Sequence, residues 1–200
     1  MTVVSRRFTL LAPLATGLAA AVPGQVLALS ASEAQGLVDK LVNDINTVIA
    51  SGKSEAAMIK DFERIFARYS DTAYVASYAM GSDARRATAA QKKKFSTTFN
   101  GYIARKYGKR FREFIGGRLE PKDAKQIKNF YSVSTNALLR GEAPFDVTFH
   151  VSDRTGKSLF FNMYVEGINM LLTERAEVGA MLDKRRGDID AMIVDLAKAG

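Results

Sequence analysis

The spacing of apolar residues in the first part of the chain predicts amphipathic helices. Over residues 30–50, apolar side chains recur every three or four positions and so share one face of a helix. Ser30 and Glu33 have the spacing of a capping box at the start of this helix. A second helix with a similar apolar face is expected over residues 54–69, and a third, shorter helix over residues 71–81.

A longer helix with aromatic side chains on one face is expected next. Thr88 and Gln91 form a second capping-box pattern at its start, and Gly116 with Gly117 is expected to end it. Its apolar stripe consists of Phe95, Phe99, Tyr102, Ile103 and Tyr107. Basic residues crowd the same region, namely Lys92, Lys93, Lys94, Arg105, Lys106, Lys109, Arg110 and Arg112.

After Pro121 the apolar period falls from about 3.6 towards 2, which indicates a change from helices to strands. Alternation over residues 145–152 and 159–165 predicts a hairpin, and a further strand or pair of strands lies within about residues 126–139. In the second strand of the hairpin, strict alternation places four apolar residues on one face: Leu159, Phe161, Met163 and Val165.

Two helices close the chain, one after Leu172 and one after Gly187. Helices, then strands, then helices is the element order of an α+β protein with segregated layers. We therefore expect a small curved antiparallel sheet packed with several helices around an apolar cavity.

The first residues have the composition of an export signal. Arg6 and Arg7 precede an uncharged run, residues 8–29, that is rich in Leu, Ala and Gly. Prolines and glycines interrupt this run, which argues against a membrane span of about 20 apolar residues. Residues 1–28 are predicted to be a signal peptide, of the twin-arginine or the Sec type, and residues 29–200 a single exported domain.

The composition argues against several kinds of chemistry. The chain has no cysteine and a single histidine, His150, and it lacks the motifs of metal-dependent hydrolases, serine hydrolases and nucleotide-binding proteins. We expect no enzymatic activity, no cofactor and no metal. The alternative is a small cavity-bearing NTF2-like enzyme, for which the obvious dyad is His150 with Asp146 or Asp153.

The net charge is basic. The formal charge is +8, and it falls to +6 when Arg6 and Arg7 are removed with the signal. The cluster over residues 92–112 is either a solvated helix face or a docking surface for anionic lipid headgroups or an acidic partner. Binding of single-stranded nucleic acid would need exposed aromatic rings among these charges. The aromatic residues fall on the opposite stripe, so no nucleic acid is expected.

Two segments resemble the MlaC-type periplasmic lipid carriers, also called toluene-tolerance or phospholipid-binding proteins. Residues 78–107 are similar to the family's Leu-Gly, Thr-x-x-Gln-Arg-x-x-Phe-x-x-x-Phe and Tyr pattern, and residues 165–169, Val-Glu-Gly-Ile-Asn, to its Val-Glu-Gly-Val-Ser step. Asn162 stands where Asp is usual, Asn169 where Ser is usual, and the chain has no tryptophan. Further matches are Arg175, Leu182, Asp188 and Leu196.

The resemblance implies a soluble protein of the Gram-negative periplasm, without catalysis, that buries the acyl chains of a diacyl phospholipid. It implies transfer between an inner-membrane ABC transporter complex and an outer-membrane lipoprotein complex, which maintains the lipid asymmetry of the outer membrane. A hopanoid or another lipid, as in a related branch, is the alternative cargo. Exposing the methylenes of a diacyl lipid, about 30 in number, to water costs about 24 kcal/mol at about 0.8 kcal/mol each, so a carrier must bury both acyl chains. The carrier itself is expected to be a monomer.

The acyl chains are expected between the sheet and the long helix. Gly167 is expected to permit a bulge or a tight bend from strand to helix. Glu166 is expected to pair with Arg175 and hold that bend, and the alternative for Glu166 is contact with the ligand. The candidate lining residues are Phe62, Phe66, Phe95, Phe99, Tyr102, Ile103, Phe145, Val147, Phe149, Phe161, Met163, Val165 and Met170.

Overall fold

The computed structural model describes residues 29–110 and 115–200. The expected signal peptide, residues 1–28, and the basic residue Arg112 lie outside this part. None of the helices in the described residues has the length and apolarity that a membrane span requires.

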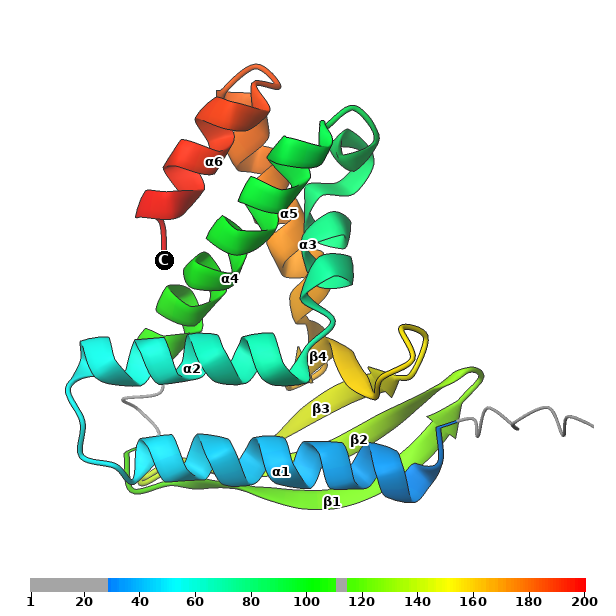
Figure 1. Ribbon diagram of the computed structural model, residues 1–200. Coiled ribbons are helices and arrows are strands. Elements are labelled where there is room, and N and C mark those ends of the chain that lie inside the picture. Colours follow the sequence, from blue (N-terminus) through cyan, green and yellow to red (C-terminus); the bar gives the residue numbers. More distant parts are fainter. Residues whose placement is uncertain (1–28, 111–114) are drawn as a thin grey trace, which may run out of the picture.

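The described residues form helices and one antiparallel sheet, which confirms the predicted α+β class (Figure 1). The sheet has five strands in the order β1-β2-β3-β4-β5, so that each strand pairs with the next one along the chain. The elements are α1 (Ala31–Ile49), α2 (Glu55–Tyr69), α3 (Thr72–Met80), the 3₁₀ helix η1 (Gly81–Arg85), α4 (Ala89–Arg110), β1 (Arg118–Ile127), β2 (Phe130–Leu138), β3 (Phe145–Ser152), β4 (Leu159–Val165), β5 (Ile168–Asn169), α5 (Met170–Lys184) and α6 (Ile189–Lys198).

Both predicted capping boxes are present. At the start of α1, Glu33 N donates to Ser30 Oγ at 3.2 Å and Ser30 N donates to Glu33 Oε2 at 2.8 Å. At the start of α4, Gln91 N donates to Thr88 Oγ1 at 3.1 Å and Thr88 N donates to Gln91 Oε1 at 3.0 Å. Local side chains therefore satisfy backbone N–H groups that would otherwise be free at these two helix starts.

The first hairpin begins earlier than the alternation predicts. Residues 126–139 were expected to hold a strand or a pair, and the structure has a pair whose first member, β1, already starts at Arg118. Pro121 lies within β1 because β1 is the edge strand, where a missing N–H donor breaks no ladder hydrogen bond. The register shifts between Pro121 and Ala124.

Strict alternation along β4 is wrong at one point. The register between β3 and β4 shifts between His150 and Val151, and Phe161 has no partner on β3. Phe160 pairs with Val151 and is buried in the core, whereas the ring of Phe161 lies 5.9 Å from the ring of His150 on the opposite face. An extra residue in one strand of an antiparallel pair, a β-bulge, produces such a change of face.

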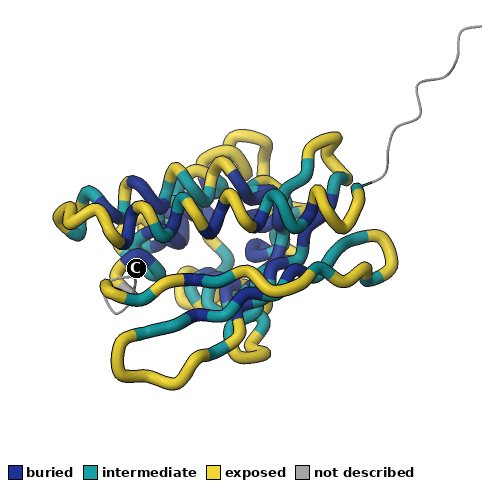
Figure 2. Tube along the Cα trace, turned by 90° about the horizontal axis from the view of Figure 1, so that it is seen from below, coloured by how far each residue is buried: buried dark blue, intermediate teal, exposed yellow. Residues whose placement is uncertain are grey.

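The buried side chains form two apolar cores. The first core lies between α1, α2 and one face of the sheet, and the second lies within the bundle of α3, α4, α5 and α6, which stands on the far side of α2 (Figure 1). Buried positions recur along the helices with exposed positions between them (Figure 2). This is the arrangement expected for amphipathic helices that each cover one core.

The long helix α4 packs mainly on α2, α3 and α6, not on the sheet as expected. A glycine on α4 permits the close approach to α2. A Cβ atom at Gly108 would lie 2.9 Å from Ile59 Cγ1. The helix α2 therefore separates most of α4 from the first core.

Candidate functional site

The two apolar cores meet at Phe66 on α2. Of the described residues, Phe66 is the one whose side chain packs against both cores. Its ring also meets Phe160 of the first core, at a centroid distance of 5.8 Å and an interplanar angle of 65°. We call this boundary between the two cores the seam.

The structure divides the predicted lining residues between the cores. Those in or against the first core are Phe62, Phe145, Val147, Phe149, Met163 and Val165. Those in the second core are Phe95, Phe99, Tyr102 and Ile103. Phe66 belongs to both, Phe161 lies on the outer face of the sheet, and Met170 is half-buried at the start of α5. The structure therefore brings them together as two groups, one on each side of the seam.

Two cavities border these cores. One, which we call the α3–α4 groove, has a volume of about 430 Å³ and is lined by Ala73, Ala76, Ser77, Met80, Ala84, Lys92, Lys93, Phe95, Ser96 and Thr97. The other has a volume of about 410 Å³ and is lined by Ile49, Ala50, Gly52, Lys53, Met58, Ile115, Gly116 and Gly117. Of the predicted lining residues, only Phe95 borders either cavity. The small residues of α3 carried no sequence signal beyond that of an ordinary helix.

The step from β4 to α5 is a small hairpin followed by a capped helix. Glu166 and Gly167 have φ values of 50° and 79° between the paired residues Val165 and Ile168. Positive φ at both central residues is the signature of a type I′ turn, so Gly167 lies in a hairpin turn between β4 and β5 rather than directly between a strand and a helix. Asn169 then caps α5 by accepting a hydrogen bond from Leu172 N at 3.2 Å.

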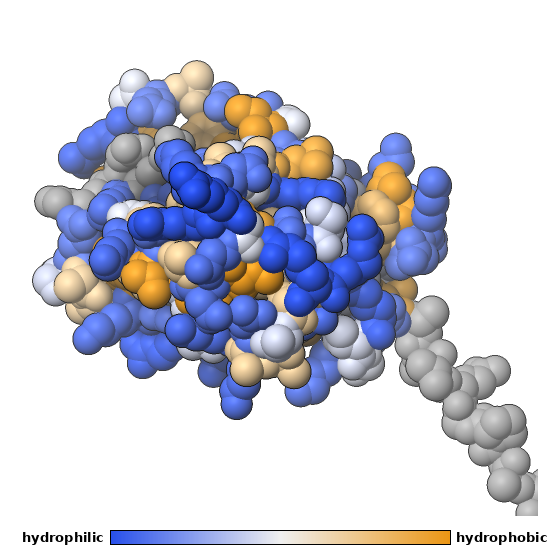
Figure 3. All heavy atoms as spheres, turned by 90° about the horizontal axis from the view of Figure 1, so that it is seen from above, coloured by the Kyte–Doolittle hydropathy of each residue, from blue (hydrophilic) through white to orange (hydrophobic). Residues whose placement is uncertain are grey.

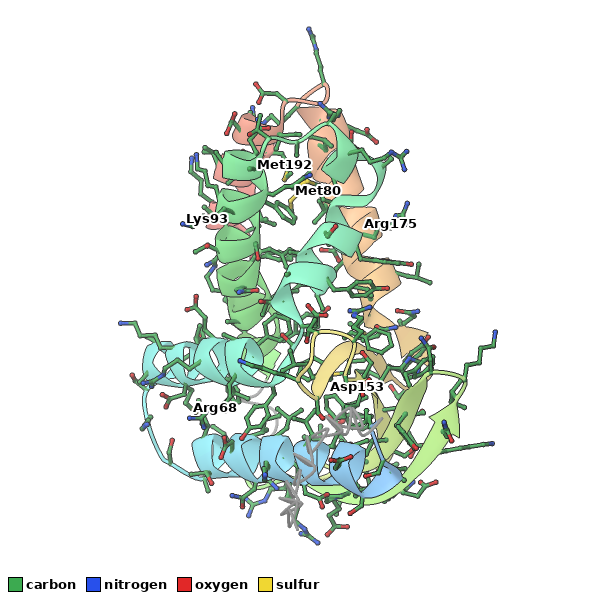
Figure 4. The ribbon with its side chains drawn as sticks, turned by 45° about the vertical axis from the view of Figure 1, so that its right-hand side comes forward. Arg68, Met80, Lys93, Asp153, Arg175 and Met192 are labelled. Carbon is green, nitrogen blue, oxygen red and sulfur yellow. The ribbon has the colours of Figure 1, made fainter. Side chains whose placement is uncertain are left out.

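The expected ion pair between Glu166 and Arg175 is not formed among the described residues. Arg175 instead lies over the ring of Tyr78, 5.3 Å from its centroid. A Cβ atom at Gly81 would lie 3.2 Å from Arg175 Nε, so the arginine also packs against the end of α3. Arg175 therefore connects α5 to α3, on the outer side of the bundle (Figure 4).

The two asparagines that depart from the family pattern join β4 to α5. Asn162 Oδ1 accepts hydrogen bonds from Met163 N at 2.8 Å and from Leu171 N at 3.3 Å. Asn169 Nδ2 donates to Tyr164 Oη at 3.0 Å. At each position the asparagine oxygen acts as an acceptor, a role that the side-chain oxygens of Asp and Ser can also fill.

A polar cluster that the sequence did not reveal joins α4 to α5. Glu174 is 3% exposed and accepts hydrogen bonds from Lys106 Nζ at 2.8 Å and from the Tyr107 hydroxyl. Lys106 Nζ also lies 2.6 Å from Glu177 Oε1, and Tyr102 Oη donates to Glu177 Oε2 at 2.6 Å. The sequence pattern predicted Tyr102 only as an apolar lining residue. It could not reveal this cluster, because the period of a helix does not show where a tyrosine hydroxyl points.

The pKa values in this cluster follow from burial and hydrogen bonding. Burial, followed by the hydrogen bond to Glu177, raises the pKa of Tyr102 far above its usual range. Burial alone would raise the pKa of Glu177, but the hydrogen bonds from Lys106 and Tyr102 outweigh it and lower this pKa. The phenol therefore stays protonated and the carboxylate charged at neutral pH, which favours a structural cluster over proton transfer.

The predicted basic cluster separates into two parts. Arg105 donates to the carbonyl oxygens of Ala199 at 2.9 Å and Leu196 at 3.0 Å, at the C-terminal end of α6. Lys109 Nζ donates to Gly200 O at 2.7 Å. These side chains hold the end of the chain against α4. The three lysines of the first part, residues 92–94, are exposed and make no ion pair within the described residues.

His150 belongs to an aromatic cluster rather than to a catalytic dyad. Its ring lies 4.7 Å from that of Phe130 and 4.8 Å from that of Tyr164, and burial lowers its pKa. Asp146 accepts a hydrogen bond from Lys122 at 2.8 Å instead.

The other dyad candidate, Asp153, accepts a hydrogen bond from Leu29 N at 2.9 Å and not from His150. In residues 29–110 and 115–200, no group of three or more His, Cys, Asp or Glu side chains could hold a metal ion. Among the described residues the geometry therefore assembles neither of the two predicted dyads.

The α+β fold is shared with a phospholipid-binding protein. The structure is similar to that of the phospholipid-binding protein from Ralstonia solanacearum in complex with a phospholipid, with a TM-score of 0.71 and 17% sequence identity over 82% of this chain and 95% of that chain. Residues 35–198 match the family model described as MlaC protein, and the chain belongs to this family. The resemblance predicted from the sequence is thereby confirmed. No curated protein matches the chain in sequence.

Proposed function

We propose that this protein is a carrier that buries the acyl chains of a diacyl phospholipid and shuttles the lipid between an inner-membrane ABC transporter complex and an outer-membrane lipoprotein complex. Membership of the MlaC family over residues 35–198, and the phospholipid bound by the structurally similar Ralstonia protein, support this function. The observation within the structure that carries it is the seam, where two apolar cores meet at Phe66.

The acyl chains enter at the seam, between α2 and the helical bundle. Separation of the two cores there exposes Phe62 and Phe66 from α2 together with Met163 from β4, all in or against the first core. Flat rings and a flexible thioether adapt to acyl chains of different length. Burial of about 30 methylenes avoids a hydration cost of about 24 kcal/mol. This is far more than the free energy lost when the contact between Phe66 and Phe160 at the seam is broken.

The carrier works as a soluble monomer in the periplasm, where it contributes to the lipid asymmetry of the outer membrane. Residues 1–28 direct export and are removed, and residues 29–200 form a single domain. The reaction makes and breaks no covalent bond, so no catalytic residue is required. The net charge of +6 that remains after removal of Arg6 and Arg7 suits contact with anionic lipid headgroups.

The test is native mass spectrometry of the protein purified from the periplasm of its own cell, followed by solvent extraction and identification of the lipid. We expect one phospholipid per protein. A bound hopanoid would instead show that the protein carries the alternative cargo, that of the related branch of the family. A protein that carries no lipid and takes none from phospholipid vesicles would overturn the proposal.

A pair of variants locates the acyl chains. Phe66→Ala removes the ring at the seam and is expected to lower the fraction of protein that retains phospholipid during native mass spectrometry. Phe130→Ala removes the same ring from the outer face of the sheet, where Phe130 meets His150 and Phe161, and is the matched control. Equal retention in the two variants would contradict the placement at the seam.

A further inference from the structure

The α3–α4 groove has the features of a second binding site. A diacyl phospholipid carried at the seam, as proposed above, does not occupy this groove. Its floor is apolar and buried, since Ala76, Met80 and Phe95 are 2%, 4% and 1% exposed. On the α3 side its wall consists of the exposed residues Ala73 and Ser77. In Figure 4, Met80 lies inside the helical bundle.

The charge at the groove is positive and uncompensated. Lys92 and Lys93 line it on the α4 side, both are exposed, and neither forms an ion pair with another described residue. No acidic side chain is among the residues that line it. The carboxylate of Asp83, next to the lining residue Ala84, pairs with Arg86 at 2.5 Å. Hydrophilic side chains surround small areas of hydrophobic atoms on the upper face of the bundle (Figure 3).

The size of the groove suits one acyl chain. Its stripe on α3 runs from Ala73 to Met80, about 10 Å at about 1.5 Å per residue. Its volume of about 430 Å³ is near the lower end of ligand pockets, which range from about 300 to 1,000 Å³. This room suits a single chain rather than the two chains of a diacyl lipid.

We propose that the α3–α4 groove binds a single-chain amphiphile with an anionic head, of which a fatty acid is the simplest. The acyl chain lies on Ala76, Met80 and Phe95, and the carboxylate faces the ammonium groups of Lys92 and Lys93. The site is separate from the seam, because the first core contributes no residue to its lining. The protein thus has room for a free fatty acid while it carries a phospholipid.

The experiment is calorimetric titration of laurate into protein that has been saturated with diacyl phospholipid. We expect one laurate to bind per protein. Ser77→Phe fills the groove from an exposed position and is expected to weaken laurate binding at least tenfold. Lys92→Gln with Lys93→Gln is expected to weaken it about fivefold, the effect of two exposed charge pairs. Lys94→Gln, an exposed neighbour that does not line the groove, is the matched control and leaves the affinity unchanged.

Two further arms complete the test. Methyl laurate has the same chain without the charge and is expected to bind about fivefold more weakly than laurate, as the double lysine variant does. Thr97→Phe fills the groove from the α4 side and replaces Ser77→Phe if that variant does not fold. The proposal is overturned if laurate does not bind the phospholipid-saturated protein. Unchanged laurate affinity in the folded groove-filling variant would overturn it equally.

Discussion

Arg154 in the turn between β3 and β4 binds Asp71 at the start of α3 through two hydrogen bonds to Asp71 Oδ2, from Nε at 3.0 Å and from the terminal nitrogen at 2.9 Å. Its guanidinium also lies 3.4 Å from the centroid of the Tyr74 ring. Asp71 in turn caps α3 by accepting a hydrogen bond from Tyr74 N at 3.1 Å. Arg154 therefore fastens the sheet to the start of α3, beside the backbone hydrogen bond from Asp71 N to Phe160 O at 2.8 Å.

The first prediction concerns this connection. Arg154→Met leaves the carboxylate of Asp71, 7% exposed, without its cation and is expected to lower the free energy of unfolding by about 2 kcal/mol. Lys122→Met breaks the exposed pair with Asp146 and should cost less than about 1 kcal/mol. Urea denaturation measures both. Equal losses would show that Arg154 does not fasten the sheet to α3.

The helix starts could be predicted because their information is local. Ser30 with Glu33 and Thr88 with Gln91 satisfy backbone N–H groups within one turn of the chain, so the spacing of three residues is enough to identify each capping box. The α+β class followed in the same way from the change of apolar period after Pro121. Family membership needed only the short segments that match the MlaC pattern.

The division into two cores could not be predicted, because the apolar period of a helix shows which of its residues are buried but not which other element buries them. The structure packs α4 on α2, α3 and α6, and at Gly108 a Cβ atom would come within 2.9 Å of Ile59 on α2. The β-bulge at Phe161 was hidden for a similar reason. Phe160 and Phe161 are both apolar, and only the pairing with β3 decides which of them is buried.

A second prediction tests the type I′ turn at Glu166 and Gly167. Gly167→Ala places a Cβ at a φ of 79° and is expected to destabilise the fold by about 1 to 2 kcal/mol. Gly179→Ala in α5, where a Cβ would meet nothing within 4 Å, should stabilise the fold by about 0.5 to 1 kcal/mol through helix propensity. Thermal unfolding of the two variants shows whether each substitution raises or lowers the stability of the fold. A stabilised Gly167→Ala variant would refute the strain argument.

A third prediction concerns acid stability and His150. Burial among aromatic rings lowers the pKa of His150 in the folded protein below its ordinary value of 6.5. At a pH between the folded pKa and the unfolded pKa, the unfolded chain therefore binds a proton that the folded protein does not. This contribution to stability is present above about pH 6.5 and is lost as the pH falls through the folded pKa. His150→Phe should therefore show a smaller loss of unfolding free energy between about pH 7.5 and about pH 5.

The carboxyl groups do not obscure this comparison. The pKa of Glu177 is lowered from 4.5, and the stability that it contributes is lost only as the pH falls below that value. Urea denaturation at the two pH values measures the difference directly. Parallel losses in the wild-type protein and in His150→Phe would show that the aromatic environment does not perturb the imidazole.

The last prediction concerns the cluster that holds α4 against α5. Lys106→Met leaves Glu174, 3% exposed, as a buried carboxylate without its cation and is expected to cost about 3 kcal/mol of unfolding free energy. Lys93→Met removes an exposed lysine without an ion pair and should change stability by less than about 0.5 kcal/mol. Adding Glu174→Gln to Lys106→Met removes the unpaired charge and should restore part of the loss. No recovery in the double variant would place the cost in lost packing of the lysine side chain rather than in the buried charge.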